Sequence, residues 1–203
     1  MLLSRAGHLT GRDEDALAYW REVEEFRCVG LVEPSATTWT SPGASPGCWV
    51  FSTWRLALLH RLQGSADPVV AAVAAKGVKE VTYHRDHAAR WTLRLGDGTG
   101  ESHRRMQDAL GWVWPHIEEL FRTTEQERRL VAAGVAVDPA DTREEVETVL
   151  AQVLERATLS RPDVPPTGTV GGRGGRQGLH TEKLEHALVV MQSLARRHPG
   201  ATW

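Results

Sequence analysis

The sequence predicts an all-α protein, a bundle of amphipathic helices. Apolar residues recur at intervals of three and four positions through most of the chain, whereas the alternating runs typical of half-buried strands are rare. Residues that cap helix ends precede several of these segments. Because each apolar stripe has to be buried against another helix, we expect one helical domain over residues 1–203.

The predicted helices follow one another as segments that each carry an apolar stripe. In chain order they cover residues about 13–32, 49–64, 68–95, 100–122, 125–133, 143–158 and 181–197. Residues 34–48 are rich in Pro, Ser, Thr and Gly and predict a loop. Residues 160–179 are rich in Pro, Gly and Arg and predict a linker before the last helix.

Local signals place the ends and bends of these helices. Asp67 followed by Pro68 is a typical helix start. The stripe of this longest helix passes through Gly77, His84, Ala88 and Trp91, and the glycine indicates a close approach of another backbone. Pro115 predicts a kink, because proline lacks an N–H and clashes with the preceding turn.

Two further helix starts carry the pattern of a capping box. Thr124 is followed three positions later by Glu127, and Thr142 by Glu145. Each pair predicts a helix that begins directly after the threonine, with Gly134 ending the first.

Composition excludes several classes of protein. The 24 Lys and Arg against 26 Asp and Glu give a formal net charge of −2, which argues against a nucleic-acid partner. No apolar run is long enough to cross a membrane. Cys28 and Cys48 cannot form a disulfide framework, so we expect a reducing, cytoplasmic setting.

Two short motifs resemble catalytic or binding motifs. Residues 43–47, GASPG, match the nucleophile-elbow pattern, but Pro46 has no N–H for an oxyanion, so we interpret them as part of a loop. The glycine-rich run at 171–178 contains Arg173 and Arg176, which could contact phosphate groups. It fits no nucleotide-binding fingerprint, and a mobile surface linker is the preferred interpretation.

Helical bundles often hold a di-iron centre on Glu and Glu-x-x-His ligands, because a three-residue spacing points both side chains inward. The sequence contains no Glu-x-x-His or Asp-x-x-His. Glu80, His84 and His103 are the residues closest to such a pattern. We interpret them as a polar seam, within the bundle or at a partner surface, and assign no catalytic, cofactor-binding or metal-binding residue.

Five segments resemble one protein family in order and over most of residues 8–203. They are GRDEDALAYWRE at 11–22, AAKGVKEVTYH at 74–84, RLGDGTGESHRRMQ at 94–107, GVAVDP at 134–139 and HTEKLEHALVVMQSL at 180–194. The chain thereby resembles the C subunits of phenylacetyl-coenzyme A epoxidase, the multicomponent oxygenase of bacterial phenylacetate degradation.

The resemblance implies a ferritin-like helical subunit that performs no oxidation itself. Its implied partners are the di-iron catalytic subunit and the other subunits of the complex, so any iron belongs to the partner and none to this chain. Relatives carry a Glu three positions before His103, where this chain has Gly100. Ser52 and Arg55 stand where another Glu-x-x-His would fall.

Two departures from the family produce further expectations. Relatives begin with additional helical sequence, so we expect this sequence to be truncated and to lack most of one core helix. Residues 35–49 lose the helical pattern of the relatives, as two compensating frame shifts would cause. An iron-binding oxygenase subunit in its own right, with Glu80 and His103 as ligands, and a helical adaptor unrelated to oxygenation stay open as alternatives.

Overall fold

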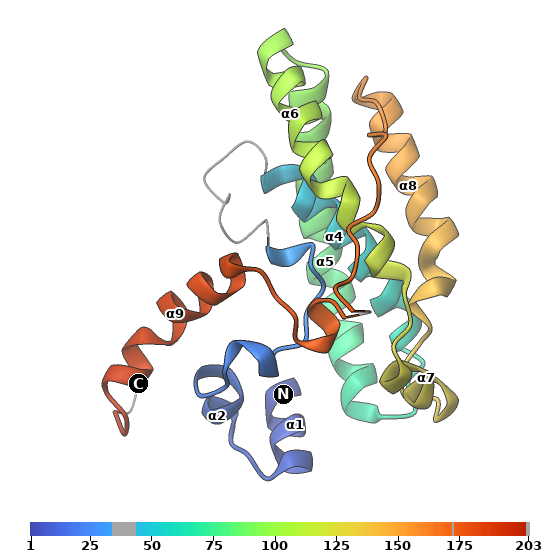
Figure 1. The fold of residues 1–203 in the computed structure, drawn as a ribbon. Coiled ribbons are helices and arrows are strands. Elements are labelled where there is room, and N and C mark those ends of the chain that lie inside the picture. Colours follow the sequence, from blue (N-terminus) through green and yellow to red (C-terminus); the bar gives the residue numbers. More distant parts are fainter. Residues whose placement is uncertain (34–43, 172, 202–203) are drawn as a thin grey trace. The chain divides into compact units, whose positions relative to one another are not determined.

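A computed structural model describes residues 1–33, 44–171 and 173–201 and divides the chain into two compact units. Unit 1 combines residues 1–37 with 169–203, and unit 2 comprises residues 38–168. Within the described residues, all regular secondary structure is helical apart from one isolated β-bridge (Figure 1). The predicted all-α class is confirmed, and a single domain over the whole chain stays a prediction.

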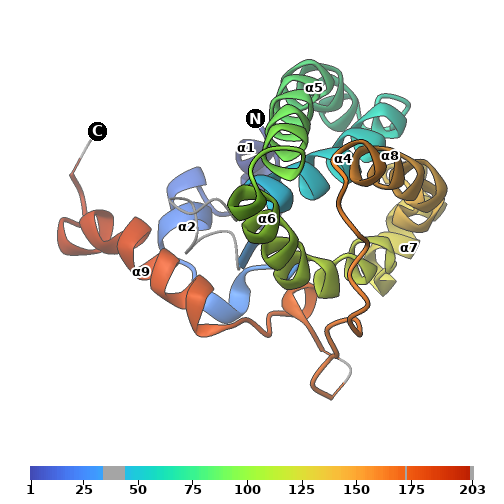
Figure 2. The ribbon, with the colours of Figure 1, turned by 90° about the horizontal axis from the view of Figure 1, so that it is seen from above.

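Unit 2 is a bundle built around the antiparallel pair of its two longest helices. Its α-helices are α4 (Ala44–Leu62), α5 (Pro68–Gly96), α6 (Gly100–Val113), α7 (Glu125–Ala132) and α8 (Arg143–Arg156). Helix α4 packs along α5 and also contacts α6 and α8 (Figure 2). The side chains at the centre of this packing are fully buried: Trp49, Val50, Met106, Leu110, Leu120 and Val146.

Helix α4 begins earlier than the sequence predicts. Residues 44–48, for which composition predicts a loop, form its first turn. Pro46 is tolerated there because the first N–H groups of a helix have no partner within it. The remainder of the predicted loop, residues 34–43, lies outside the described residues.

Helix α5 agrees with the prediction at both ends. The Asp67 carboxylate accepts hydrogen bonds from the N–H groups of Val69 and Val70 at 2.8 and 3.2 Å. A Cβ on Gly77 would lie 3.1 Å from the side chain of Leu59 on α4, so a side chain of the neighbouring helix, and not the predicted backbone, approaches this glycine.

The buried face of α5 differs from the predicted stripe. Ala88 of the predicted stripe is buried, but so are Ala74 and Thr92, which lie outside it, whereas His84 is exposed and Trp91 is 44% exposed. The chain therefore packs its small residues inward, which lets α4 and α5 approach closely, and leaves large rings outside.

The helix predicted over 100–122 is interrupted at Pro115. Helix α6 ends at Val113, and the 3₁₀ turns η2 (Trp114–His116) and η3 (Glu118–Phe121) follow. Pro115 lies in the first turn of η2, and because it has no N–H it cannot continue the α-helical hydrogen bonds of α6. The α-helix therefore ends at Val113, and the kinked helix predicted over 100–122 is wrong.

The first predicted capping box is present. Thr124 Oγ1 accepts from the N–H of Glu127 at 3.2 Å, and the Glu127 carboxylate accepts from the N–H of Thr124 at 2.7 Å. Gly134, with φ of +70°, follows α7 in the left-handed conformation that glycine favours.

The second predicted capping box is wrong. The Thr142 hydroxyl donates to the Pro139 carbonyl at 2.7 Å, within the 3₁₀ turn η4 (Pro139–Thr142). Glu145 instead accepts from Arg61 on α4 at 2.8 Å. Because η4 leads directly into α8, Thr142 already has helical dihedral angles and cannot act as a side-chain cap.

Unit 1 is assembled from both ends of the described chain. Its elements are α1 (Leu2–Thr10), α2 (Glu14–Tyr19), η1 (Val23–Glu25), η5 (Gly175–Gln177) and α9 (Glu182–Arg197). Helix α9 begins one residue after the predicted start and ends at the predicted residue.

The helix predicted over 13–32 is wrong, because the chain leaves the helical conformation after Tyr19. The Arg21 side chain turns back to donate to the Leu17 carbonyl, and the Glu25 carboxylate accepts from the N–H of Glu22 at 2.9 Å. These side chains satisfy the polar groups at the break, so the chain starts a 3₁₀ turn in place of a longer helix.

The predicted linker over 160–179 is built into the fold at its C-terminal part. A Cβ on Gly175 would lie 2.4 Å from the carbonyl oxygen of Cys28, so the two backbones touch. The N–H of Cys28 also donates to the Gly175 carbonyl at 3.4 Å. Residues 174–178 are therefore a packed turn of unit 1 and not a mobile linker.

Candidate functional site

Two of the three residues assigned to a polar seam lie on the surface of α5. The Glu80 side chain is 62% exposed and lies 4.0 Å from the Lys76 ammonium, a contact of little energetic weight. His84 is also exposed. Neither side chain lies within the bundle, so only the partner-surface form of the expectation remains a prediction.

His103 has a structural partner at the turn between α5 and α6. Its Nδ1 lies 2.7 Å from the backbone carbonyl oxygen of Gly96, to which it donates a hydrogen bond. Gly96 follows Glu80 by 16 positions, or about 24 Å along the helix at about 1.5 Å per residue. The structure therefore does not bring Glu80 and His103 together.

The residues at the remaining family positions do not fit a di-iron centre. The Ser52 hydroxyl donates to the Cys48 carbonyl at 2.6 Å. Arg55 is partly buried, and burial lowers the pKa of its guanidinium. An arginine remains a cation near neutral pH and would repel a metal ion. A serine and an arginine in place of Glu and His leave no carboxylate–imidazole ligand set on α4.

Arg176 of the glycine-rich run lies in the packed turn of unit 1, and Arg173 directly precedes this turn. Arg173 is exposed and donates to the Gln177 carbonyl at 3.2 Å. Arg176 is half-buried in the same turn. Their contact with a phosphate group stays a prediction.

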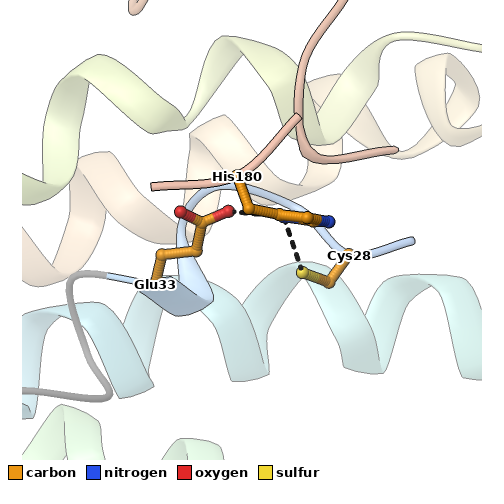
Figure 3. Close-up of side chains that lie close together, drawn as sticks. All are labelled: Cys28, Glu33 and His180. Atoms are coloured by element: carbon orange, nitrogen blue, oxygen red, sulfur yellow. Dashed lines mark hydrogen bonds and ion pairs between the residues drawn. The ribbon is translucent and has the colours of Figure 1, made fainter. Parts of the chain in front are cut away.

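A buried polar cluster that the sequence analysis missed joins the two chain segments of unit 1. Cys28, Glu33 and His180 each place one potential ligand atom within 4.8 Å of the others (Figure 3). The imidazole and the carboxylate are 2% and 3% exposed. His180 Nδ1 lies 2.9 Å from Glu33 Oε1 and 3.8 Å from Cys28 Sγ.

Hydrogen bonds hold both ring nitrogens of His180. Nε2 lies 3.0 Å from the carbonyl oxygen of Phe26, which can only accept. Nδ1 faces the Glu33 carboxylate, whose other oxygen accepts from the N–H and hydroxyl of Thr181 at 2.8 and 2.6 Å. Each polar atom of the imidazole and of the Glu33 carboxylate thus has a hydrogen-bond partner within unit 1.

No local pattern could have identified this cluster, because Glu33 and His180 are 147 positions apart. The only sequence signal was the HTEKL segment, in which His180 and Thr181 are the first two residues. The incorrect helix over 13–32 also placed Cys28 on a helix.

Exposed aromatic rings form a ridge along α5, made of Tyr83, His87 and Trp91 at four-residue spacing. The Tyr83 and His87 rings stack at 6.1 Å between centroids, and His87 meets Trp91 edge-on at 6.4 Å. Tyr83 is 68% exposed. A second apolar surface lies on α9, where the following side chains are at least half exposed: Val189, Val190, Met191 and Leu194.

Comparison with known proteins identifies the family. The family model described as phenylacetic acid catabolic protein matches residues 1–203. The chain belongs to this family. It is 38% identical over 202 residues to the C subunit of 1,2-phenylacetyl-CoA epoxidase from Escherichia coli K12, and the match covers 99% of this chain and 79% of that relative.

Membership in the family agrees with the observed architecture. The phenylacetic acid catabolic proteins are ferritin-like, and the helices of unit 2 form such a bundle. The resemblance drawn from the five sequence segments is confirmed. Among the described residues, no helix is long and apolar enough to cross a membrane.

Proposed function

We propose that this chain is a structural, non-catalytic subunit of a phenylacetyl-CoA epoxidase and packs against its di-iron catalytic subunit. The observation that carries this proposal is the 38% identity to the C subunit of the Escherichia coli epoxidase, which extends over 99% of the chain. The reaction would belong to aerobic phenylacetate degradation. A cytoplasmic location stays a prediction.

The donor set of unit 2 supports a non-catalytic role. A di-iron centre needs carboxylates and imidazoles that point into one bundle core. Here Glu80 is exposed, His103 donates to a backbone carbonyl, and Arg55 places a positive charge on α4. The chain would act by packing against the catalytic subunit and stabilising its fold.

The exposed apolar surfaces support a protein partner. Aromatic rings and aliphatic side chains are less stable in water than in an apolar contact, so a partner that covers them gains binding free energy. The ridge of Tyr83, His87 and Trp91 on α5 and the α9 surface around Val190 offer such contacts. Tyrosine and tryptophan are also the residue types that dominate binding energy in protein interfaces.

The test is co-purification from the protein's own host grown on phenylacetate. A tagged chain should recover a di-iron oxygenase subunit in about equal amount, identified by mass spectrometry, and the iron should follow that subunit. Recovery of no oxygenase subunit would overturn the proposal. Stoichiometric iron in the isolated chain would favour an iron-binding subunit, and a partner unrelated to oxygenation would favour a helical adaptor.

Surface variants refine the test. Trp91→Ser and Val190→Ser remove exposed apolar side chains and should each weaken recovery of the partner if their surface is covered in the complex. Lys79→Ser, at an exposed polar position of the same helix as Trp91, is the control and should leave recovery unchanged. Equal recovery with all three variants would place the partner on another surface.

A further inference from the structure

We propose that Cys28, Glu33 and His180 form a Zn²⁺ site inside unit 1. The inference is independent of the proposed function, because it concerns only the residues of this cluster. A thiol, a carboxylate and an imidazole are the three side-chain types that zinc binds in proteins. Their ligand atoms all lie within 4.8 Å of one another, with Glu33 buried and Cys28 and His180 partly buried (Figure 3).

The distances between the three ligand atoms are close to those around a single zinc ion. Zinc lies about 2.3 Å from a thiolate sulfur and about 2.0–2.2 Å from nitrogen or oxygen ligands. At tetrahedral angles, two such ligand atoms are about 3.3–3.6 Å apart. The observed separations, 3.8 Å from Cys28 Sγ to His180 Nδ1 and 2.9 Å from that nitrogen to Glu33 Oε1, bracket this range.

The surrounding hydrogen bonds orient the ligands. His180 Nε2 donates to the Phe26 carbonyl, so Nδ1 is the nitrogen aimed at the cluster. A zinc-bound histidine typically fixes its ring through such a bond from the other nitrogen. The Glu33 oxygen that does not face His180 is held by Thr181, which leaves Oε1 for the ion.

The charges of the zinc-bound site cancel. Zinc binds cysteine as the thiolate and histidine as the neutral ring, and any protons that these ligand atoms carry pass to solvent. The ion then faces one thiolate and one carboxylate, so the total charge is zero and no net charge is buried.

The donor set favours zinc over other divalent ions. Thiolate and imidazole are soft or intermediate ligands, whereas magnesium and calcium prefer oxygen alone. Three protein ligands leave the fourth tetrahedral position for water. Because Glu33 and His180 are 147 positions apart, the ion would link the residues before α4 to the start of α9.

The experiment uses the full-length chain, stripped of metal with a chelator and then titrated with Zn²⁺ or with Co²⁺ as a spectroscopic probe. One ion should bind per chain, and cobalt should produce a thiolate-to-metal charge-transfer band and the intense visible bands of tetrahedral coordination. Cys28→Ser should abolish the charge-transfer band. It should lower zinc affinity by more than the roughly tenfold loss typical of an outer-shell change.

Two further variants test the zinc site in case Cys28→Ser affects folding. Glu33→Gln can donate to Nδ1 and accept from Thr181, so it should fold while losing zinc affinity. Cys48→Ser changes the other cysteine, which lies on α4, and should bind like the unmodified chain. Absence of one-to-one binding, or a charge-transfer band that survives Cys28→Ser or disappears with Cys48→Ser, would overturn the proposal.

Discussion

The backbone carbonyl of Gly96, the last residue of α5, accepts a hydrogen bond from Nδ1 of His103 on α6 at 2.7 Å. Next to it, a Cβ on Gly96 would lie 2.6 Å from the carbonyl oxygen of Ala157, directly after α8. Three helices therefore meet at a residue with no side chain. Any added atom there would collide with backbone, which cannot move aside as a side chain can.

We expect Gly96→Ala to destabilise the protein by about 1–3 kcal/mol, because it overpacks this junction. Gly111→Ala is the matched control, since Gly111 also lies within a helix but has open space around it. It should stabilise the protein by about 0.5–1 kcal/mol through the higher helix propensity of alanine. Urea unfolding measures both, and equal effects of the two variants would contradict the packing explanation.

The ion pair between Glu118 and Arg143 should make the stability of the protein depend on pH in the acidic range. Two hydrogen bonds of 2.7 and 2.9 Å join them, and the guanidinium also lies over the Phe121 ring at 4.4 Å. The hydrogen bonds from Arg143 hold the pKa of Glu118 below its ordinary value of about 4.3. The stabilisation is therefore present above about pH 4.3 and is lost as pH falls through the lower pKa of folded Glu118.

Arg143→Met should cost up to about 1 kcal/mol at neutral pH, since both charged groups are partly exposed and water screens them. The difference from the unmodified chain should shrink as the pH falls below about 4.3. Arg129→Met removes an exposed pairing with Glu125 within one helix and should cost less than about 0.5 kcal/mol. A pH-independent effect of Arg143→Met would assign its role to packing on Phe121.

Two variants of Glu33 should show whether the buried contact between Glu33 and His180 stabilises the protein through its hydrogen bonds or through the charge of the carboxylate. Glu33→Leu leaves the imidazole and the Thr181 N–H without their acceptor and should cost about 3–5 kcal/mol. Glu33→Gln should cost much less, because its amide can donate to a neutral ring and still accept from Thr181. Unfolding in the presence of a chelator measures both, and equal losses would mean that the charge itself is required.

Glu80 and His84 should be dispensable for folding and for iron. Both are exposed on α5, and surface changes away from specific contacts alter stability by less than about 0.5 kcal/mol. Glu80→Ala and His84→Ala should therefore leave the unfolding curve unchanged and should leave the iron content of the purified complex unchanged. Loss of iron in either variant would revive a metal-binding role for this chain.

Local signals predicted much of unit 2 from the sequence. The Asp67 cap and the Thr124 and Glu127 box each depend on residues within a few positions, and both are present. Pro115 was predicted to kink a helix and instead ends one. The second box failed because η4 precedes α8 and engages the Thr142 hydroxyl first. The predicted helix start after Thr142 is nevertheless correct, since α8 begins at Arg143; only the side-chain bonds of the capping box are missing.

Unit 1 was predicted less well, because its structure depends on residues far apart in the chain. The apolar spacing of residues 13–32 fits a helix, but Gln192 on α9 donates to the carbonyls of Ala18 and Arg21, where the helix stops. The Glu33 and His180 pair likewise exists only once the two segments meet. Periodicity describes the face of a segment and cannot show which distant segment provides its hydrogen bonds.

The assembly of unit 1 from both ends of the chain imposes an order on protein synthesis. After Glu33 is added to the growing chain, another 147 residues must be added before His180 is in place. At about 5–20 residues per second, this delay is roughly 7–30 s. All residues of unit 2 are made within that interval, during which His180 is not yet available to the carboxylate of Glu33. The nascent chain thus has time to form its bundle before its N-terminal segment has a partner.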